Sequence, residues 1–330
     1  MNTDPRSASE LAILYESQIK GKVVLTTGVS PGGIGAAFVA GIARAQPTLL
    51  ILAGRNIAKV QQTADAVSAT GVKVRMLELD LVSLAAVRSA ADKVNSWDDV
   101  PHIDVLVNNA GVMAIDWEPS PEGYDSQLAA NHLGPFLFTN LIMGKLLESP
   151  APRVVNVTSD GHRLSPFRFD DYNFRDGEFY NKWLSYGQSK TANMLMAVSL
   201  AEKLGSKKHK LSAFSVQPGL VTTNLGAHLK LFGEDDSDMR SMRDVDRFMG
   251  NAIGWSGFDG VVACTPDVGS NTYVYAAFDP EITAHNGAYL ISCRIADPWI
   301  DTVKPWATSS VEAERLWMLS EKLVGQQFSY

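Results

Sequence analysis

A tyrosine and a lysine four residues apart give the clearest indication of chemistry in this chain. Tyr186 and Lys190 stand in the stretch Ser-Tyr-Gly-Gln-Ser-Lys, and a helix brings residues at this spacing onto one face. A phenol has a pKa of about 10 in water, and a neighbouring cation favours its ionised form, so the pair could transfer protons at neutral pH. Enzymes that oxidise alcohols or reduce carbonyls need such a group. An exposed helix face could also carry both residues without any function.

Glycines far upstream of this pair indicate a nucleotide-binding turn. Residues 21–28 form a short apolar strand pattern, and Gly28, Gly33 and Gly35 then lead into an apolar, alanine-rich run over 36–45. Glycines let the main chain approach a pyrophosphate closely, and the free N–H groups at the start of the next helix bind the anion. A glycine cluster on its own could equally be a tight turn.

Two more strand patterns end in small, amide or hydroxyl residues. Residues 103–111 run from an apolar strand into Asn-Asn-Ala-Gly, and residues 153–159 run into Thr-Ser. Ligands of doubly wound sheets lie at the carboxyl ends of the strands, so both endings are expected at the site.

Taken in order, these motifs resemble the short-chain dehydrogenase/reductase superfamily. The matching features are the glycine turn, Asn-Asn-Ala-Gly, an Asn on the next helix, a Ser after the fifth strand, Tyr-x-x-x-Lys and Pro-Gly, from about residue 20 to residue 222. The stretch Tyr-Gly-Gln-Ser-Lys-Thr-Ala-Asn over 186–193, the long interval between Ser159 and Tyr186, and Gly-Ala-Tyr-Leu over 287–290 resemble the branch that contains retinol dehydrogenases and the WW-domain oxidoreductase.

The resemblance implies a role for each of four polar residues. Tyr186 would exchange a proton with the substrate oxygen, and Lys190 would lower the pKa of that tyrosine and hold the nicotinamide ribose. Ser159 would hydrogen-bond the substrate oxygen as charge develops on it. Asn131 would support a water-mediated proton path to Lys190. The cofactor would supply the hydride.

NADP(H) is the expected cofactor, because Arg55 follows the second strand, where an acidic residue would select NAD(H). The planar guanidinium suits a 2'-phosphate, although the same residue could be a surface arginine at a helix start. By resemblance, Asp80 would lie beside the adenine ring. The other expected cofactor contacts, with no metal ligand among them, are Gly28, Ser30, Gly33, Ile34, Gly35, Asn56, Leu81, Asn108, Ala110, Gly111, Tyr186, Lys190, Pro218, Gly219, Val221 and Thr222.

The glycine turn departs from the usual family spacing Gly-x-x-x-Gly-x-Gly. Four residues separate Gly28 from Gly33, so residues 30–32 must bulge. The sequence therefore leaves open which amides contact the pyrophosphate. The expectation of an anion site at the helix start depends only on Gly33 to Gly35 and is unaffected.

Alternating strand and helix patterns predict an α/β fold: a doubly wound parallel sheet (Rossmann fold) of about seven strands with helices on both faces. The 330 residues would allow two domains, but no linker interrupts the motifs, so a single domain over 1–330 is expected. Strands are predicted at 22–27, 48–53, 72–79, 103–108, 153–158, 211–216 and 288–291, and helices at 34–45, 57–69, 84–96, 126–147 and 183–204.

Two segments fall outside this alternation. An insertion over 164–183, rich in Phe, Tyr, Asp and Arg, is expected beside the active-site mouth or as a packed surface excursion. Residues 220–263 follow the sixth strand and combine an acidic run with apolar residues, and they contain one expected helix around 239–249. We expect this second segment to be a substrate lid, with a permanently packed helical subdomain as the alternative.

Some aromatic and histidine residues near the motifs allow two interpretations. His162, three residues after Ser159, could tune the site or serve only in packing. Trp183 could line the substrate pocket or cap the insertion. Trp299, Trp306 and Trp317 could close over the cleft or dock the C-terminal part of the chain on the core.

The composition of the chain limits the kinds of partner that the protein is expected to bind. A net charge of −7 argues against nucleic acid or an anionic membrane as the main partner, and two cysteines give neither a disulfide framework nor a metal-site spacing. No signal peptide or integral membrane segment is readable, so a cytoplasmic location is expected. In this family the helix carrying the tyrosine commonly packs against a partner subunit. The insertion before Tyr186 would obstruct that surface, so a monomer or weak homodimer is expected.

The expected function is that of an NADP(H)-dependent oxidoreductase acting on CH–OH groups. It would transfer a hydride between the nicotinamide and a hydrophobic small-molecule substrate, namely a ketone, aldehyde or secondary alcohol of moderate size. One alternative is a biosynthetic enzyme that uses the same pocket for cyclisation, imine reduction or isomerisation. Another is a non-catalytic NADPH-binding regulator, against which the complete Asn-Ser-Tyr-Lys set argues.

Overall fold

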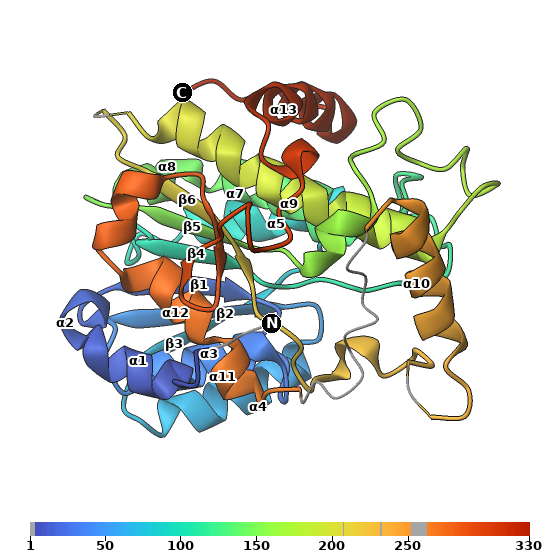
Figure 1. The fold of residues 1–330 in the computed structure, drawn as a ribbon. Coiled ribbons are helices and arrows are strands. Elements are labelled where there is room, and N and C mark those ends of the chain that lie inside the picture. The colour runs from blue at the N-terminus through green and yellow to red at the C-terminus, as the bar shows by residue number, and fades with distance from the viewer. Residues whose placement is uncertain (1–3, 207, 232, 252–262) are drawn as a thin grey trace.

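An eight-stranded sheet lies at the centre of the computed structural model, which describes residues 4–206, 208–231, 233–251 and 263–330 (Figure 1). The strand order is β3-β2-β1-β4-β5-β6-β7-β8, and all neighbouring strands are parallel except β7 and β8. The strands are β1 (Val23–Thr27), β2 (Leu49–Gly54), β3 (Val74–Glu78), β4 (Val105–Asn108), β5 (Arg153–Val157), β6 (Ser212–Gln217), β7 (Tyr289–Ile291) and β8 (Arg294–Ile295).

The seven strands predicted from the sequence are all present, and the sheet forms a single domain as expected. They were readable because strands buried on both faces are continuous apolar runs. Strand β8 was not predicted. It has only two residues, and the turn before it uses Ser292 and Cys293 at φ of 51° and 55°, not the Asn-Gly or Asp-Gly pair that marks such turns in a sequence.

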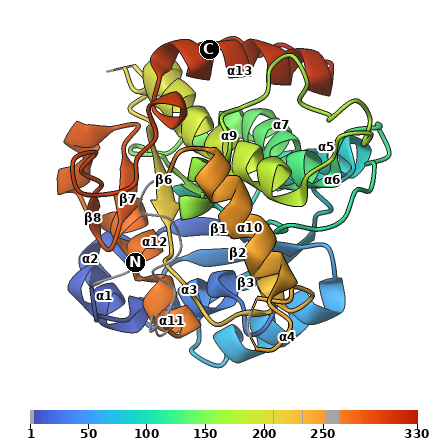
Figure 2. The same cartoon turned by 45° about the vertical axis from the view of Figure 1, so that its right-hand side comes forward.

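Helices cover both faces of the sheet (Figure 2). Helices α5, α7 and α9 bury their apolar sides against one face, and α3, α4 and α12 cover the other. The helices are α1 (Ala8–Leu14), α2 (Glu16–Ile19), α3 (Ile34–Ala43), α4 (Ile57–Ser68), α5 (Leu84–Asn95), α6 (Ser126–Leu128), η1 (Ala129–Leu133), α7 (Gly134–Leu141), α8 (Met143–Leu147), η2 (Asp160–Leu164), α9 (Lys182–Leu204), η3 (Asn224–Gly226), α10 (Ser237–Phe248), α11 (Pro266–Gly269), α12 (Asn271–Phe278), η5 (Glu281–His285), η6 (Pro305–Ala307) and α13 (Ser310–Val324).

The long helix predicted over 126–147 is divided into α6, the π-helical turn η1, α7 and α8. Pro135 gives a physical reason, because it has no N–H to donate to the carbonyl of Asn131 four residues earlier. Regular α-helical hydrogen bonding therefore cannot continue past this point. The widened turn lies where Asn131 is needed.

The helices at the two ends of the chain were not predicted, although their boundary signals are present. Ser7 and Glu10 form a reciprocal capping box at the start of α1. Ser309 caps the start of α13, and Gly325 ends that helix in the left-handed conformation. Helix α1 packs on α3 and α12, and α13 packs across α9.

Candidate active site

The carboxyl ends of β1 and β4 mark the functional edge of the sheet. The two strands are neighbours, whereas the chain continues from β1 to β2 on one side and from β4 to β5 on the other. Such a reversal of strand order opens a crevice at the carboxyl edge of a doubly wound sheet. The glycine turn follows β1, Asn-Asn-Ala-Gly begins at the end of β4, and Ser159 follows β5, so these three motifs meet at this edge.

Ser159 and Tyr186 lie against each other. Ser159 caps η2, and its Oγ accepts a hydrogen bond from Gly161 N at 3.0 Å. Tyr186 is buried on the second turn of α9, where a hydrogen bond with Ser159 favours the ionised phenol. A Cβ at Gly161 would lie 2.6 Å from Cε1 of the tyrosine ring. Only glycine at this position allows the loop after Ser159 to contact the tyrosine. Gly161 is not among the site residues predicted from the sequence, although a glycine two residues after Ser159 indicates a close approach of the main chain.

Lys190 lies one helical turn beyond Tyr186, as the spacing predicts. Its Nζ is 5.6 Å from the centroid of the Tyr186 ring and donates a hydrogen bond to the Val157 carbonyl at 3.3 Å. Burial raises the pKa of Tyr186 to about 12 and lowers the pKa of Lys190 to about 8. The expected lowering of the phenol pKa by the lysine is therefore outweighed here, because loss of hydration disfavours both charged forms.

Asn131 lies at the centre of a small group of side-chain hydrogen bonds, and the water-mediated path expected for it stays a prediction. Its Oδ1 accepts a hydrogen bond from Val112 N at 2.8 Å, and its Nδ2 donates to Val112 O and to Ser189 Oγ, each at 2.9 Å. The side chain thus joins η1 to α9 and to the segment after β4. A Cβ at Gly111 would lie 2.9 Å from Asn131 Oδ1 and 3.4 Å from Lys190 Nζ, so these groups surround Gly111 closely.

The glycine turn brings β1 close to β4 and leads into α3. Gly28 has a φ of 74°, and a Cβ there would meet Ala110 Cα at 2.6 Å. Gly33 stands before α3 and gives that helix no side-chain cap, so the N–H groups at Ile34 and Gly35 are not capped by a side chain. Amides at a helix N-terminus bind anions. The turn therefore lies against the end of β4 and leads directly into a helix start of the kind that binds anions.

The bulge expected within this turn is present. Gly33 N donates to Ser30 O at 3.1 Å, and Gly32 has a φ of 76°. Both Ser30 and Gly32 are exposed. The additional residue is thus accommodated in a turn over 30–33, and α3 still begins directly at Ile34.

The residues expected to contact the cofactor after β2 and β3 differ in whether their side chains are exposed or already engaged within the protein. Arg55 is exposed, and none of the described residues pairs with its guanidinium. Asn56 caps α4 by accepting a hydrogen bond from Lys59 N at 3.1 Å. Asp80 accepts one from Val82 N at 3.1 Å and is half-buried, while the Leu81 side chain lies in the core.

Asn108 likewise uses its side chain within the protein. Its Nδ2 donates to Thr139 Oγ1 at 3.0 Å and to Asn156 Oδ1 at 2.9 Å. The side chains of Asn56, Leu81 and Asn108 therefore each contribute to the fold, through the cap of α4, the core and the hydrogen bonds between β4, α7 and β5. Ala110 and Gly111, directly after β4, are half-buried at the crevice.

The turn after β6 is hydrogen-bonded to a segment that lies much further along the chain, at Cys264. Gly219, which follows Pro218, has a φ of 86°, and Val221 forms a parallel bridge with Cys264. Thr222 N donates to Cys264 O at 3.0 Å, and Cys264 N donates to Leu220 O at 2.9 Å. The two ends of the expected lid are therefore held together at the edge of the sheet.

Helix α10, the one helix expected in that lid, packs on α9 and on η2, the turn after Ser159 (Figure 2). Met239, Met242 and Val245 form one apolar cluster with Leu164 and Trp183, together with Ala114. This contact shows that Trp183 packs beneath α10. Residues 252–262 of the expected lid lie outside the described residues.

Ion pairs also hold α10 in place. Arg163, on η2, pairs with Asp246 at 2.8 Å, and both side chains are buried. Asn251 Nδ2 donates to Arg163 O at 3.1 Å, and Lys182 at the start of α9 pairs with Asp238. Both η2, which follows Ser159, and α9, which carries Tyr186 and Lys190, are therefore linked to α10. In sequence terms the buried partners are 83 residues apart, which no local pattern indicates.

The insertion over 164–183 lies packed beside the start of α9. Phe167 and Phe174 are buried, and Asn173 Oδ1 accepts a hydrogen bond from Asp125 N at 2.7 Å. A Cβ at Gly177 would overlap the Trp117 ring at 2.5 Å. These contacts support the interpretation of the insertion as a packed surface excursion.

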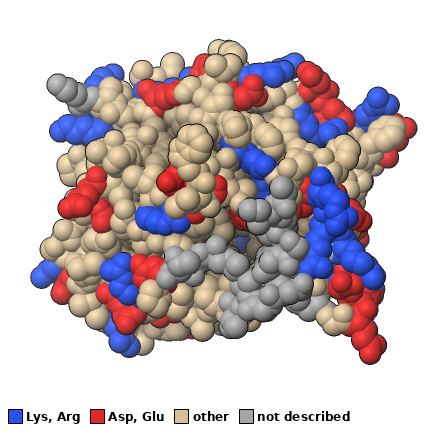
Figure 3. All heavy atoms as spheres, viewed as in Figure 1, with Lys and Arg blue, Asp and Glu red and all other residues tan. Residues whose placement is uncertain are grey.

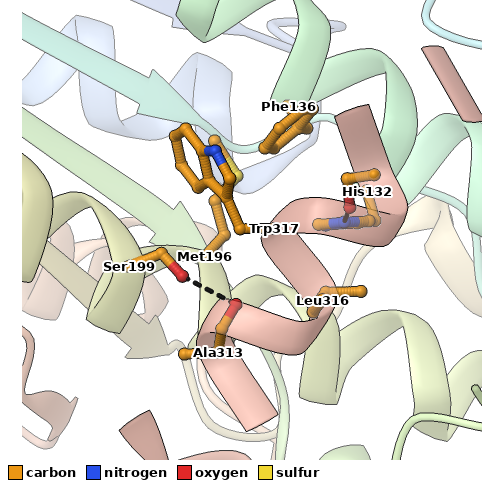
Figure 4. A pocket seen from close by; sticks show the side chains of 8 residues that line it. His132, Phe136, Met196, Ser199, Ala313, Leu316 and Trp317 are labelled. Carbon is orange, nitrogen blue, oxygen red and sulfur yellow. Dashed lines mark hydrogen bonds between the residues drawn. The ribbon is translucent and has the colours of Figure 1, made fainter. Parts of the chain in front are cut away.

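The tryptophans near the C-terminus have three different environments. Trp299 is 95% exposed, and Trp306 Nε1 donates to His162 O at 3.2 Å. Trp317 is buried against Phe136, with ring centroids 4.9 Å apart (Figure 4). Packing, and not closure over the cleft, is therefore what the structure shows for Trp317.

Comparison with known proteins identifies the family. The sequence matches the short chain dehydrogenase model over residues 22–173. It is 31% identical to human retinol dehydrogenase 14 over 92% of this chain and 87% of that protein, and 34% identical to the short-chain dehydrogenase/reductase prx1 of Penicillium rubens over 93% of this chain and 86% of that protein. The chain belongs to the short-chain dehydrogenase/reductase superfamily. Within it, the relatives confirm the retinol dehydrogenase-like branch.

Solved structures agree with this assignment. A structure of an uncharacterized protein from Mycobacterium paratuberculosis is 27% identical, has a TM-score of 0.67 and covers 95% of this chain and 97% of its own. The NADPH-bound carbonyl reductase from chicken fatty liver shares the fold at 19% identity, with a TM-score of 0.60, covering 84% of this chain and 99% of its own. This short-chain dehydrogenase/reductase is thus an oxidoreductase of a family that uses nicotinamide cofactors.

Charge on the short-chain dehydrogenase/reductase surface is mixed in sign. On the face in Figure 3, Lys and Arg side chains lie among Asp and Glu side chains. On α10, Arg240 pairs with Asp236 at 3.3 Å and Arg247 with Asp244 at 3.7 Å. No helix in the described part of the chain is both long and apolar enough to span a membrane.

Proposed function

We propose that this short-chain dehydrogenase/reductase transfers a hydride between NADP(H) and a hydrophobic ketone, aldehyde or secondary alcohol. The observation that carries the proposal is the meeting of Ser159, Tyr186 and Lys190 beside a glycine turn at the carboxyl edge of the sheet. Two findings support the substrate class. Relatives of this branch are named retinol dehydrogenases, and an apolar cluster that includes Trp183 and Met239 lies next to the catalytic loop.

The cofactor fits the residues present at the crevice. The start of α3, which has no side-chain cap, would hold the pyrophosphate, and the absence of a side chain at Gly28 lets the turn lie directly against Ala110 at the end of β4. Arg55, exposed and unpaired among the described residues, would bind a 2'-phosphate. When bound, the nicotinamide supplies the hydride.

Tyr186 and its neighbours would handle the proton. With a pKa of about 12, the buried phenol is protonated at neutral pH, which is the form that carbonyl reduction requires. Tyr186 would donate this proton to the carbonyl oxygen. Ser159 Oγ accepts from Gly161 N, and its own O–H, which is directed toward Tyr186 here, would turn to hydrogen-bond the same substrate oxygen. The Lys190 ammonium would stabilise the phenolate that proton donation leaves behind.

The proposal is tested by NADPH consumption with a panel of aldehydes, ketones and polycyclic carbonyls. Tyr186→Phe should lower turnover by about 10²- to 10⁴-fold, the usual share of general acid catalysis, while NADPH binding is retained. A variant that keeps more than half of the wild-type rate at saturating substrate would show that Tyr186 is not the catalytic acid. NADPH binding without turnover of any carbonyl would favour a regulator, and product mass would reveal cyclisation or imine reduction.

A further inference from the structure

His162 lies fully buried between the catalytic serine and the C-terminal part of the chain. Its ring Nδ1 is 2.9 Å from Ser159 O, and its Nε2 is 3.3 Å from the main-chain N of Lys304. The imidazole edge faces the Tyr289 ring, with centroids 5.4 Å apart. The sequence left open whether this histidine tunes the site or only packs.

The two contacts determine which ring nitrogen carries the proton. A carbonyl oxygen can only accept, so Nδ1 must be protonated to donate to Ser159 O. A main-chain N–H can only donate, so Nε2 must offer its lone pair to Lys304 N. His162 is therefore neutral, with its proton on Nδ1. Burial lowers the pKa of the imidazole and favours the same neutral form.

The main chain of His162 adds two more links. Its carbonyl accepts hydrogen bonds from Thr191 Oγ1 at 3.1 Å and from Trp306 Nε1 at 3.2 Å. Thr191 directly follows Lys190 on α9. One residue thus connects the loop of Ser159, the helix of Tyr186 and the segment around Lys304 and Trp306.

We propose that His162 is a positioning residue for Ser159: Nδ1 fixes the serine main chain, and Nε2 anchors the loop to the segment at Lys304. The inference rests on the proposed function, in which the Ser159 hydroxyl binds the substrate oxygen. That hydroxyl must remain opposite Tyr186, and a displacement of about 1 Å in a catalytic group can cost about 10²-fold in rate.

Two substitutions separate the two ring nitrogens. In His162→Asn the amide nitrogen is attached at Cγ, like Nδ1, and can still donate to Ser159 O. In His162→Gln the amide lies one carbon further out, at the place of Nε2. Its oxygen can accept a hydrogen bond from Lys304 N, but the side chain no longer has a donor at the place of Nδ1. We expect His162→Asn to keep kcat within about threefold of wild type, and His162→Gln to lower kcat at least about tenfold, since only the second removes the side-chain hydrogen bond to Ser159 O and leaves that carbonyl with the His162 main-chain N–H, at 3.1 Å, as its donor. The KM for NADPH should be unchanged in both variants.

A double-mutant cycle tests whether the effect passes through the serine. In a Ser159→Ala background, His162→Gln should reduce the residual rate by less than about twofold, because the positioned group is already absent. Equal kcat losses in His162→Asn and His162→Gln, or a full tenfold loss in the Ser159→Ala background, would overturn the proposal and leave a histidine with a structural role only.

The proposal can fail separately from the proposed function. Long-range ¹H–¹⁵N spectra of the full chain should show His162 protonated at Nδ1 and unprotonated at Nε2, whether or not any carbonyl is reduced. A proton on Nε2 would overturn the positioning role even in an active enzyme. Absence of turnover in a wild-type protein with the Nδ1 proton in place would instead overturn the proposed function.

Discussion

At the residue scale, burial determines the charge of the two residues that we propose handle the proton, Tyr186 and Lys190. Both side chains are buried, and burial shifts each pKa in the direction that favours the neutral form, to about 12 for Tyr186 and to about 8 for Lys190. At pH 7 the phenol keeps its proton and most of the lysine remains charged. At this pH Tyr186 can therefore donate a proton. Lys190 loses its charge near pH 8, well below the pKa of about 10.4 of a lysine in water.

The first prediction at this scale concerns pH. Because burial lowers the pKa of Lys190 to about 8, the ammonium is lost as the pH rises through that value. With the cation lost, the phenolate left after proton donation would no longer be stabilised. The kcat/KM for NADPH reports groups of the free enzyme and should therefore fall above about pH 8. A kcat/KM that stays level up to the ordinary pKa of a lysine, about 10.4, would contradict this assignment.

Arg55 supports the second prediction at this scale. Arg55→Asp replaces an exposed phosphate partner by a charge that repels a phosphate, so NADPH should bind more weakly while NADH binds equally well or better. Dissociation constants for both cofactors measure the effect. Lys59→Asp, an equal change of charge at an exposed position one turn along α4, is the matched control. Equal losses for both cofactors in Arg55→Asp would mean that this arginine is structural.

The motifs could be read at this scale because each is local. Ser159, Tyr186 and Lys190 stand in short patterns whose geometry follows from one strand end and one helix. The partners of Asn108 and His162 could not be read in this way. His162 meets Lys304 across 142 residues of sequence, and Asn108 meets Asn156 across 48. Such contacts follow from how whole elements pack, which a single sequence does not specify.

At the scale of elements, α10 is the segment whose behaviour matters most. The expectation of a mobile lid over 220–263 stays a prediction, but the contacts of the described part favour the packed alternative. Arg163 and Asp246 form a buried ion pair, and the apolar side of α10 is covered by Leu164 and Trp183. A lid that opened at α10 would have to separate two buried charges.

This arrangement predicts strong protection of α10 in the free protein. Hydrogen exchange of the amides over 237–248 should be slow without NADP and should change little when NADP and a substrate analogue bind. Asp246→Asn should remove this protection, because breaking a buried ion pair and leaving one charge unpaired costs about 3–5 kcal/mol.

Asp244→Asn is the matched control for that substitution. Asp244 lies on the same helix and pairs with Arg247 at 3.7 Å, but both side chains are largely exposed. Exposed pairs contribute about 0–1 kcal/mol, so exchange in this variant should resemble wild type. Rapid exchange of α10 in the free wild-type protein, followed by protection with ligand, would instead establish the lid.

The whole molecule differs from the sequence-based picture mainly at its C-terminal end. Helix α13 lies across α9, on the side away from the sheet (Figure 1). His132 Nε2 is 2.8 Å from Ser320 Oγ, and Ser199 Oγ donates to Ala313 O at 2.9 Å, so polar contacts join α13 to both η1 and α9 (Figure 4). Trp317 fills the space between them. The side of α9 that faces away from the sheet is therefore covered by α13.

The packing of α13 on α9 gives a second reason, besides the insertion over 164–183, to expect a monomer or weak dimer. Light scattering at micromolar concentration should give the mass of one chain. Trp317→Ala should loosen α13, since truncating a buried aromatic side chain costs about 3–5 kcal/mol, and the exposed apolar surface of α9 should then promote self-association. Met318→Ala, on the same helix but 56% exposed, should leave the mass unchanged. A stable wild-type tetramer would show that α13 does not prevent subunits from pairing.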